Sequence, residues 1–268
     1  MAHMSLVYTH TTKQPEWIQE YTHLEYLHIE GIFFASLMSL LEGMFDKMSS
    51  LAFVHLGFHP ILSTLPSFDG LTRLKSLTLA MLFSLVELPT FDTAHNLERL
   101  LLVSLVNVNS LPDLTPVKKV NMFTVADRAP WCCNGFLGSC DLQNPNCQVH
   151  PLWGTPAATC LSSNRTDDHP SDGTLEVLKK FSRTICYDLL LPGKIDVPPS
   201  EDSMRQCNGT LYRRCEWPGV KEAMCYSSRL MAISCSANPY PIEMRRHQIQ
   251  CGIGDRCDPL YEAWLGCI

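Results

Sequence analysis

Cysteine has the widest chemistry of any residue type in this sequence, because its thiol can form disulfides, ligate metals or act as a nucleophile. The chain has 268 residues and thirteen cysteines, and none of them precedes residue 132. Structural zinc sites usually draw on C-x-x-C pairs, and this sequence contains no such pair. Secreted proteins use disulfides to stabilise regions with small cores, whereas cytosolic proteins rarely keep so many thiols. We therefore predict disulfides and no metal site.

The candidate disulfide residues are Cys132, Cys133, Cys140, Cys147, Cys160, Cys186, Cys207, Cys215, Cys225, Cys235, Cys251, Cys257 and Cys267. Since thirteen is odd, one thiol is free, pairs with another chain, or has its partner outside this sequence. The spacing leaves the connectivity open. A catalytic cysteine needs a free thiolate beside a base, and disulfides should consume most of these thiols.

Motifs for enzymatic chemistry are missing from the sequence, which contains no G-x-S-x-G, H-E-x-x-H or P-loop pattern. Gly252-Ile253-Gly254 lacks the third glycine of a dinucleotide-binding loop and follows a helical pattern rather than a strand. We therefore expect a protein that is not an enzyme and has no cofactor. An enzyme housed in the C-terminal half, built from residues far apart in the sequence, is the alternative.

The glycosylation motifs and the charge indicate where the protein acts. Two sequons, at Asn164 and Asn208, fall in the cysteine-containing half and favour an extracellular setting. The net charge of −6 and the pI near 5.9 argue against a nucleic-acid partner. No apolar run of about 18 residues predicts a transmembrane segment. The polar residues 9–14 do not resemble an export signal, so we expect a mature or partial chain, extracellular or at the cell surface.

The first half of the chain, which contains no cysteine, carries an internal repeat. The pattern L-x-x-L-x-L begins at Leu24, Leu51, Leu74, Leu97 and, in degenerate form, Val117. These starts are separated by 27, 23, 23 and 20 residues, and a leucine-proline pair follows three of them after fourteen residues. A phenylalanine-aspartate pair stands six residues before three of the starts. Two independent motifs in one register predict stacked coils, each with a short strand that buries one face.

The repeats resemble the leucine-rich-repeat family over roughly residues 24–125. The resemblance implies an α/β solenoid with a curved parallel sheet, in which Leu77, Leu79, Leu100 and Leu102 are among the most buried residues. The family usually places asparagine eight residues after each start, and this sequence does not. Those positions hold Ile32, His59, Leu82 and Leu105.

The strand positions that alternate with the buried leucines should face outward on the concave side of the sheet. The residues that we expect to bind a ligand there are Tyr26, His28, Phe53, His55, Arg99, Leu101, Lys119 and Phe123. Aromatic residues and arginine are enriched at interface centres, so the predicted ligand is a protein, peptide or glycan. His28 and His55 should be neighbours whose titration changes binding between about pH 5 and 7. Alternatively, these residues pack against the C-terminal half.

The predicted organisation has five segments. Residues 1–23, including Trp17 and Tyr21, cover the first edge; residues 24–128 form the repeats; residues 129–161 form a cysteine-rich cap; residues 162–173 form a linker or loop; and residues 174–268 form a disulfide-pinned, mainly helical region. Helices are expected after Ser171 or Asp172, over Pro241 to Cys251, and from Asp258 to Gly266.

The run from Cys207 to Cys267, including Trp264-Leu265-Gly266-Cys267, loosely resembles the tails of secreted or surface leucine-rich-repeat proteins of oomycetes. This resemblance suggests a second hypothesis, a secreted effector or inhibitor that acts through the cysteine-rich half.

Overall fold

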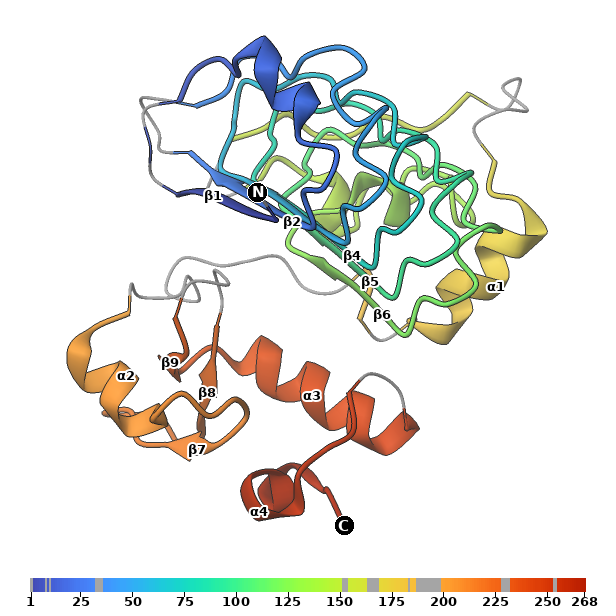
Figure 1. Ribbon diagram of the computed structural model, residues 1–268. Coiled ribbons are helices and arrows are strands. Elements are labelled where there is room, and N and C mark those ends of the chain that lie inside the picture. Colours follow the sequence, from blue (N-terminus) through green and yellow to red (C-terminus); the bar gives the residue numbers. More distant parts are fainter. Residues whose placement is uncertain are drawn as a thin grey trace. The chain divides into compact units, whose positions relative to one another are not determined.

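The computed structural model describes residues 2–7, 9, 11–31, 36–150, 154–162, 169–182, 184–186, 199–227, 232–252 and 255–268 (Figure 1). The chain divides into two compact units, Met1–Leu189 and Leu190–Ile268. The helix that begins near the predicted boundary at residue 174 belongs to the first of these units. No helix in the described residues is long and apolar enough to cross a membrane.

The first unit is a solenoid of parallel strands. Its six-stranded sheet follows the order of the sequence, and each strand pairs in parallel with the next (Figure 1). The strands are β1 (His3–Val7), β2 (Tyr26–Glu30), β3 (Phe53–Gly57), β4 (Ser76–Ala80), β5 (Arg99–Val103) and β6 (Met122–Ala126). The register is constant, so that residues at the same place in successive coils lie side by side.

The core of the solenoid consists of aligned apolar residues, as the repeat predicts. Leu77 and Leu79 are 0 % exposed, and Leu100 and Leu102 are 1 % and 2 % exposed, which confirms their prediction as core residues. The phenylalanines of the repeated phenylalanine-aspartate pair form a second buried row. Neighbouring rings in this row, Phe45 with Phe68 and Phe68 with Phe91, have centroids 5.8 and 6.0 Å apart.

The last strand differs from the prediction by three residues. β6 pairs Met122 with Arg99 and Phe123 with Leu100, so the coil starts at Val120, 23 residues after Leu97. Val117 is buried in the turn before the strand, at the place that Leu71 and Ala94 hold in earlier coils. An apolar residue at that turn position imitates the first leucine of the pattern, which explains the shifted register.

The first edge of the sheet is a strand rather than the predicted cover. β1 pairs with β2 so that Met4 and Leu6 align with Leu27 and Ile29. Methionine in place of leucine concealed this copy of the pattern in the sequence. The 3-10 helix η1 (Glu16–Glu20) follows, and Trp17 in it is 51 % exposed, packed edge-on against Tyr21 at 5.5 Å.

The residue after each of four strands has a left-handed backbone, although none of the four is glycine. These residues are Phe58, Met81, Ser104 and Asp127, with φ between 52° and 72°. Other contacts replace only in part the asparagine that the leucine-rich-repeat family usually places eight residues after each start. Nδ1 of His59 accepts a hydrogen bond from the amide of Leu37, whereas Leu82 and Leu105 are simply buried. Ile32 lies outside the described residues.

A disulfide-bonded cap follows β6, as the sequence predicts. It contains η2 (Pro130–Cys132) and η3 (Pro145–Cys147), and its disulfides join Cys132 to Cys186, Cys133 to Cys147 and Cys140 to Cys160. The helix α1 (Asp172–Lys180) begins at Ser171, whose hydroxyl accepts a hydrogen bond from the amide of Thr174. Thr184 then accepts a hydrogen bond from the amide of Val125, which covers the free edge of β6.

The second unit combines helices with a small sheet, so the prediction of a mainly helical region is not confirmed. Its elements are α2 (Glu201–Cys207), β7 (Arg214–Cys215), β8 (Ala223–Tyr226), β9 (Ser234–Ser236), α3 (Pro239–Cys251), α4 (Pro259–Glu262) and η5 (Ala263–Leu265). The three strands are antiparallel and too short for their alternation to be visible in the sequence. The predicted helices before Gly252 and after Asp258 are present.

Three further disulfides stabilise the second unit. They join Cys207 to Cys225, Cys215 to Cys235 and Cys257 to Cys267. Cys251, at the end of α3, is exposed and is the one cysteine without a disulfide. All thirteen cysteines lie in the described residues, so the odd number in the sequence corresponds to this single thiol.

Candidate functional site

The outer sheet face of the solenoid consists of the first, third and fifth residues of each strand, which alternate with the core residues. Because the register is constant, these residues form three rows across the strands. The first row holds His3, Tyr26, Phe53, Ser76, Arg99 and Met122. The middle row holds Ser5, His28, His55, Thr78, Leu101 and Thr124, and the third holds Val7, Glu30, Gly57, Ala80, Val103 and Ala126.

The first row carries a stack of three planar rings. His3 stacks on Tyr26 with ring centroids 4.1 Å apart, and Tyr26 stacks on Phe53 at 4.2 Å with an interplanar angle of 2°. Tyr26 and Phe53 are half-buried, whereas His3 is exposed. Burial raises the pKa of the Tyr26 phenol, which therefore stays neutral. The stack is a continuous apolar surface with edges open to solvent.

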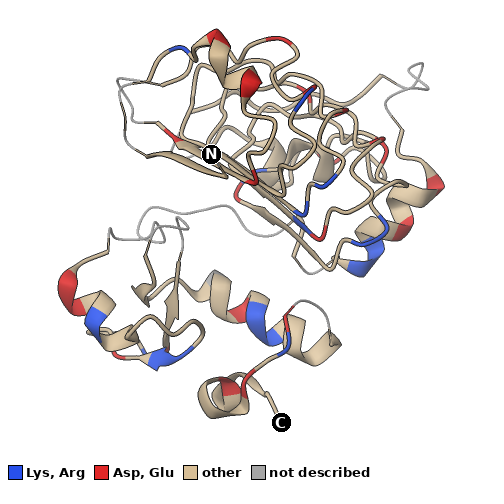
Figure 2. Cartoon of the chain, viewed as in Figure 1, with Lys and Arg blue, Asp and Glu red and all other residues tan. Residues whose placement is uncertain are grey.

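Charge is sparse on this sheet. Glu30 and Arg99 are the charged residues among the six strands, and Figure 2 shows the remaining charges of the first unit on its helices and connecting segments. Arg99 is exposed and lies in the same row as Tyr26 and Phe53, with Ser76 between it and Phe53. The aromatic stack of the first row is therefore separated from a cation by a single small polar residue.

The middle and third rows bring two histidines and a carboxylate together. His28 and His55 are direct neighbours on β2 and β3, and their ring centroids are 4.2 Å apart. His28 Nε2 lies 3.3 Å from Glu30 Oε2. His28, Glu30 and His55 are buried, with exposed fractions of 2 %, 7 % and 5 %. One possible ligand atom from each of the three lies within 4.8 Å of the others.

The imidazole of His55 is neutral in this environment. Burial, together with the charges of His28 and His59, lowers the pKa of His55 to about 3. Burial also lowers the pKa of His59 to about 4, although a hydrogen bond with the backbone of Ile29 and the charge of Glu30 oppose that shift. The predicted titration between pH 5 and 7 is therefore wrong for His55.

The structure brings together four of the eight predicted binding residues, namely Tyr26, His28, Phe53 and His55. Arg99 and Leu101 lie on the same face in β5. The other two, Lys119 and Phe123, do not belong to it: Lys119 precedes β6, and Phe123 is buried in the core with its ring 6.1 Å from Phe181. Both errors follow from the shifted register of the last strand.

Sequence reasoning missed His3 because β1 was not recognised. It also missed the importance of Gly57, whose lack of a side chain leaves space for the imidazole of His55. A Cβ atom at Gly57 would lie 2.7 Å from His55 Nε2 and 3.5 Å from Glu30 Cγ. Glycine inside a strand often marks such a close approach, and this signal was available in the sequence.

Of the two predicted glycosylation sequons, the one at Asn208 lies in the described residues. Asn208 is exposed at the end of α2 in a left-handed backbone conformation with φ 47°, and Thr210 of its sequon follows in the same turn. Asn164 lies outside the described residues. The cysteines Cys207, Cys215 and Cys225 also lie close together, but their sulfur atoms are committed to disulfides.

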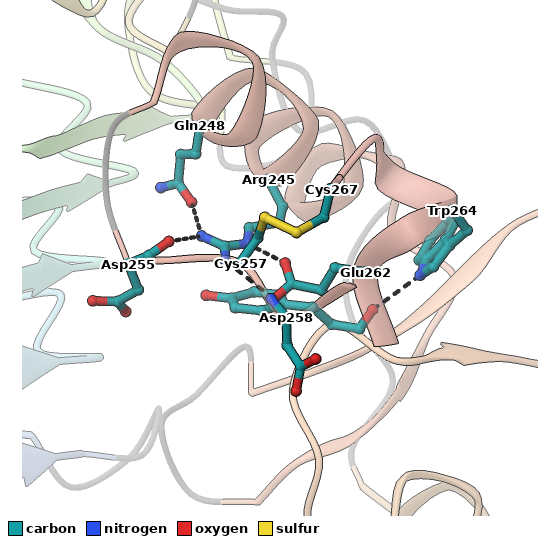
Figure 3. A network of polar contacts seen from close by, with 9 residues as sticks. Arg245, Gln248, Asp255, Cys257, Asp258, Glu262, Trp264 and Cys267 are labelled. Atoms are coloured by element: carbon teal, nitrogen blue, oxygen red, sulfur yellow. Dashed lines mark hydrogen bonds and ion pairs between the residues drawn. A yellow bond between two sulfur atoms is a disulfide. The ribbon is translucent and has the colours of Figure 1, made fainter. Parts of the chain in front are cut away.

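The second unit contains a buried polar network that is shown in Figure 3. Arg245 of α3 donates two hydrogen bonds to Glu262, from Nε to Oε2 at 2.6 Å and from Nη2 to Oε1 at 3.2 Å. Its Nη1 donates to the carbonyl of Asp255 and to Gln248. The guanidinium also lies over the ring of Tyr212, 4.3 Å from the centroid. These contacts compensate the charge of Arg245, so that removal of one partner would leave the other as a buried, unpaired charge.

The first unit is thus a parallel-strand solenoid with a disulfide-bonded cap and a partly aromatic outer sheet face. The second unit is matched by a known family: residues 202–268 match the WLGC domain. No curated protein is similar enough to the chain to be matched.

The residues Trp264 to Cys267 spell the four letters of that domain, and each has a structural role. Trp264 donates a hydrogen bond from Nε1 to the carbonyl of Tyr212 at 3.1 Å. Leu265 packs in a core with Met224 and Ile242. Gly266 ends η5 with a φ angle of 100°, a left-handed conformation that residues with a side chain rarely adopt. Cys267 closes the disulfide with Cys257. Through these contacts the four residues attach the C-terminal end of the second unit to the rest of its fold.

Proposed function

We propose that the protein is an extracellular or cell-surface recognition protein, which binds a protein, peptide or glycan through the outer sheet face of its solenoid. The observation that carries this proposal is the stack of His3, Tyr26 and Phe53, with ring centroids 4.1 and 4.2 Å apart. Rigid rings present a large contact area and lose little conformational entropy on binding, which is why aromatic residues dominate interface energetics. Arg99 in the same row adds an exposed cation with a planar set of donors.

The setting outside the cell is supported by the six disulfides, because such bonds persist in oxidising compartments. The exposed sequon at Asn208 is a suitable acceptor for an N-linked glycan. We further propose that the solenoid belongs to the leucine-rich-repeat type. In this proposal the chain is a receptor-like, secreted or surface protein, with a tail similar to those of oomycete proteins of this type. Recognition rather than catalysis is the role that we assign to the chain.

The test is affinity capture with the disulfide-intact full chain, using extracellular fluid of the source organism. Partners retained by the parent chain are then measured against Phe53→Ala and Arg99→Ala, which remove side chains from the first row. Val86→Ala and Arg73→Ala are matched controls, because both residues are exposed and lie outside the strands. We expect both first-row variants to fold and to lose most of the captured partner, and the controls to retain it. Equal capture by all four variants would refute the proposal.

A second candidate function is that of a secreted effector or inhibitor that acts through the second unit. It is favoured by the WLGC domain match, which is confined to residues 202–268 and so describes this unit without the solenoid. The two functions differ in the capture experiment. If the effector hypothesis holds, Phe53→Ala and Arg99→Ala retain the partner, whereas substitutions on the surface of the second unit, such as Leu260→Ala, release it. Leu260 is 77 % exposed and therefore available for contact.

A further inference from the structure

We propose that His28, Glu30 and His55 form a binding site for a divalent transition-metal ion of the zinc class. Two imidazoles and one carboxylate are ligands that suit zinc and related ions, and three protein ligands leave coordination positions open for water or another group. This inference does not depend on the recognition function proposed above.

The positions of the three residues follow from the fold. Parallel register makes His28 and His55 direct neighbours, and Glu30 stands two residues after His28, on the same face of β2. One ligand atom from each residue lies within 4.8 Å of the others. Tetrahedral coordination with bonds of about 2.0–2.2 Å places ligand atoms about 3.4 Å apart. The 3.3 Å separation of His28 Nε2 and Glu30 Oε2 already matches that value.

One nitrogen atom of the site is unpaired. Nδ1 of His55 is buried and has no hydrogen-bond partner among the described residues. A buried polar atom without a partner is destabilising, so a native structure seldom keeps one without a reason. His150 shows the contrast, because this equally buried histidine contacts Asp127 at 2.8 Å, and Asp127 accepts a hydrogen bond from Ser104. A metal ion bound through Nδ1 of His55 would give this atom a partner.

The strand around the site is shaped to admit these side chains. Gly57 pairs with Glu30 in the third row, and any larger residue there would press on the imidazole of His55. The φ angle of Gly57 is not positive, so the backbone does not require glycine at this position. Space for His55 beside Glu30 is therefore the reason for a glycine inside β3.

The charges also suit a metal ion. Neutral imidazole is the form that ligates metals, and it adds no charge to the site. One carboxylate and two neutral imidazoles around a divalent ion leave a net charge of about +1. A buried site with that charge would attract an anionic group to the open coordination positions.

The experiment uses the untagged full chain carrying Cys251→Ser, because Cys251 Sγ lies 3.5 Å from His247 Nδ1 and this exposed pair can itself hold zinc. Zinc chloride is titrated calorimetrically into the parent and into Glu30→Gln and His55→Ala. We expect one ion per chain. Replacing a residue that only supports a ligand weakens metal binding about 10–100-fold, so each ligand variant should lose about 100-fold or more. His23→Ala, which removes an exposed histidine outside the strands, is the matched control and should bind like the parent.

Failure of the parent to bind zinc at millimolar concentration would overturn the proposal, as would unchanged affinity in both ligand variants. Circular dichroism establishes whether each variant folds. If a variant does not fold, X-ray absorption of the zinc-loaded parent decides the matter. Two imidazoles and an oxygen ligand at about 2.0–2.2 Å support the site, and a shell without imidazole refutes it.

Discussion

Arg245 and Glu262 form a buried ion pair in the second unit, joined by two hydrogen bonds. Their side chains are 1 % and 5 % exposed. Glu262 also accepts a hydrogen bond from the amide of Asp258, at the start of α4. The pair therefore connects α3 to the turn that precedes the Trp264–Cys267 segment.

Replacing Arg245 with methionine should leave Glu262 as a buried, uncompensated charge. Removing one partner of a buried ion pair typically lowers stability by about 3–5 kcal/mol. The loss is measured by native-state hydrogen exchange of the amides in α3. Arg205→Met is the matched control, because Arg205 and Asp202 form an exposed pair with 74 % and 84 % exposed side chains, and such pairs contribute about 0–1 kcal/mol. Equal losses in the two variants would contradict this account of the network.

A single free thiol is expected in the folded chain. Twelve cysteines form six disulfides, and Cys251 is exposed. Alkylation of the non-reduced protein, followed by mass spectrometry, should label Cys251 alone. Labelling of several cysteines under native conditions would argue against the disulfide pattern and against an oxidising compartment.

Neighbouring leucines in β5 should differ sharply in their contribution to stability. Leu100 is 1 % exposed in the core, whereas Leu101 is half-buried on the outer sheet face. Leu100→Ala should lower the free energy of unfolding by about 2–5 kcal/mol because it leaves a cavity. Leu101→Ala should have an effect below about 1 kcal/mol. Guanidinium denaturation of the two variants makes the comparison, and a reversed order would mean that the register of β5 is wrong.

Asp113 should make the first unit less stable in acid. Partial burial acts to raise the pKa of this carboxyl, but hydrogen bonds from Ser171, Thr115 and Thr174 outweigh it and lower the pKa to about 2, from a usual value of 3.8. The folded state therefore favours the ionised form. This stabilisation is complete above about pH 5 and is lost as the pH falls from about 5 to 1.

The measurement is the difference in melting temperature between the parent and Asp113→Asn from about pH 7 to about pH 2. The difference should be largest near neutral pH and small near pH 2. Asp92→Asn, at another exposed aspartate of the solenoid, controls for the general effect of removing a charge. A difference that does not change with pH would show that the carboxylate of Asp113 does not contribute in this way.

The sequence predicted the central strands well because their leucines repeat every 23 residues. It placed His28 beside His55 by register alone, and the structure confirms this pair. Prediction was poorer where another apolar residue satisfied the same pattern, as Val117 did, or where methionine replaced leucine, as at Met4. The roles of Glu30 and Gly57 depend on side-chain approach across two strands, which periodicity does not encode. Disulfide partners and the Arg245–Glu262 pair depend on tertiary folding in the same way.

The disulfides also determine how the chain responds to a protease. None of the six links the segment that ends at Cys186 with the segment that begins at Cys207. A single cut between these two cysteines would therefore leave two polypeptides with no covalent link between them, each with three of its own crosslinks intact. Gene rearrangement at the same point could likewise join either piece to a new neighbour without separating the two cysteines of any disulfide.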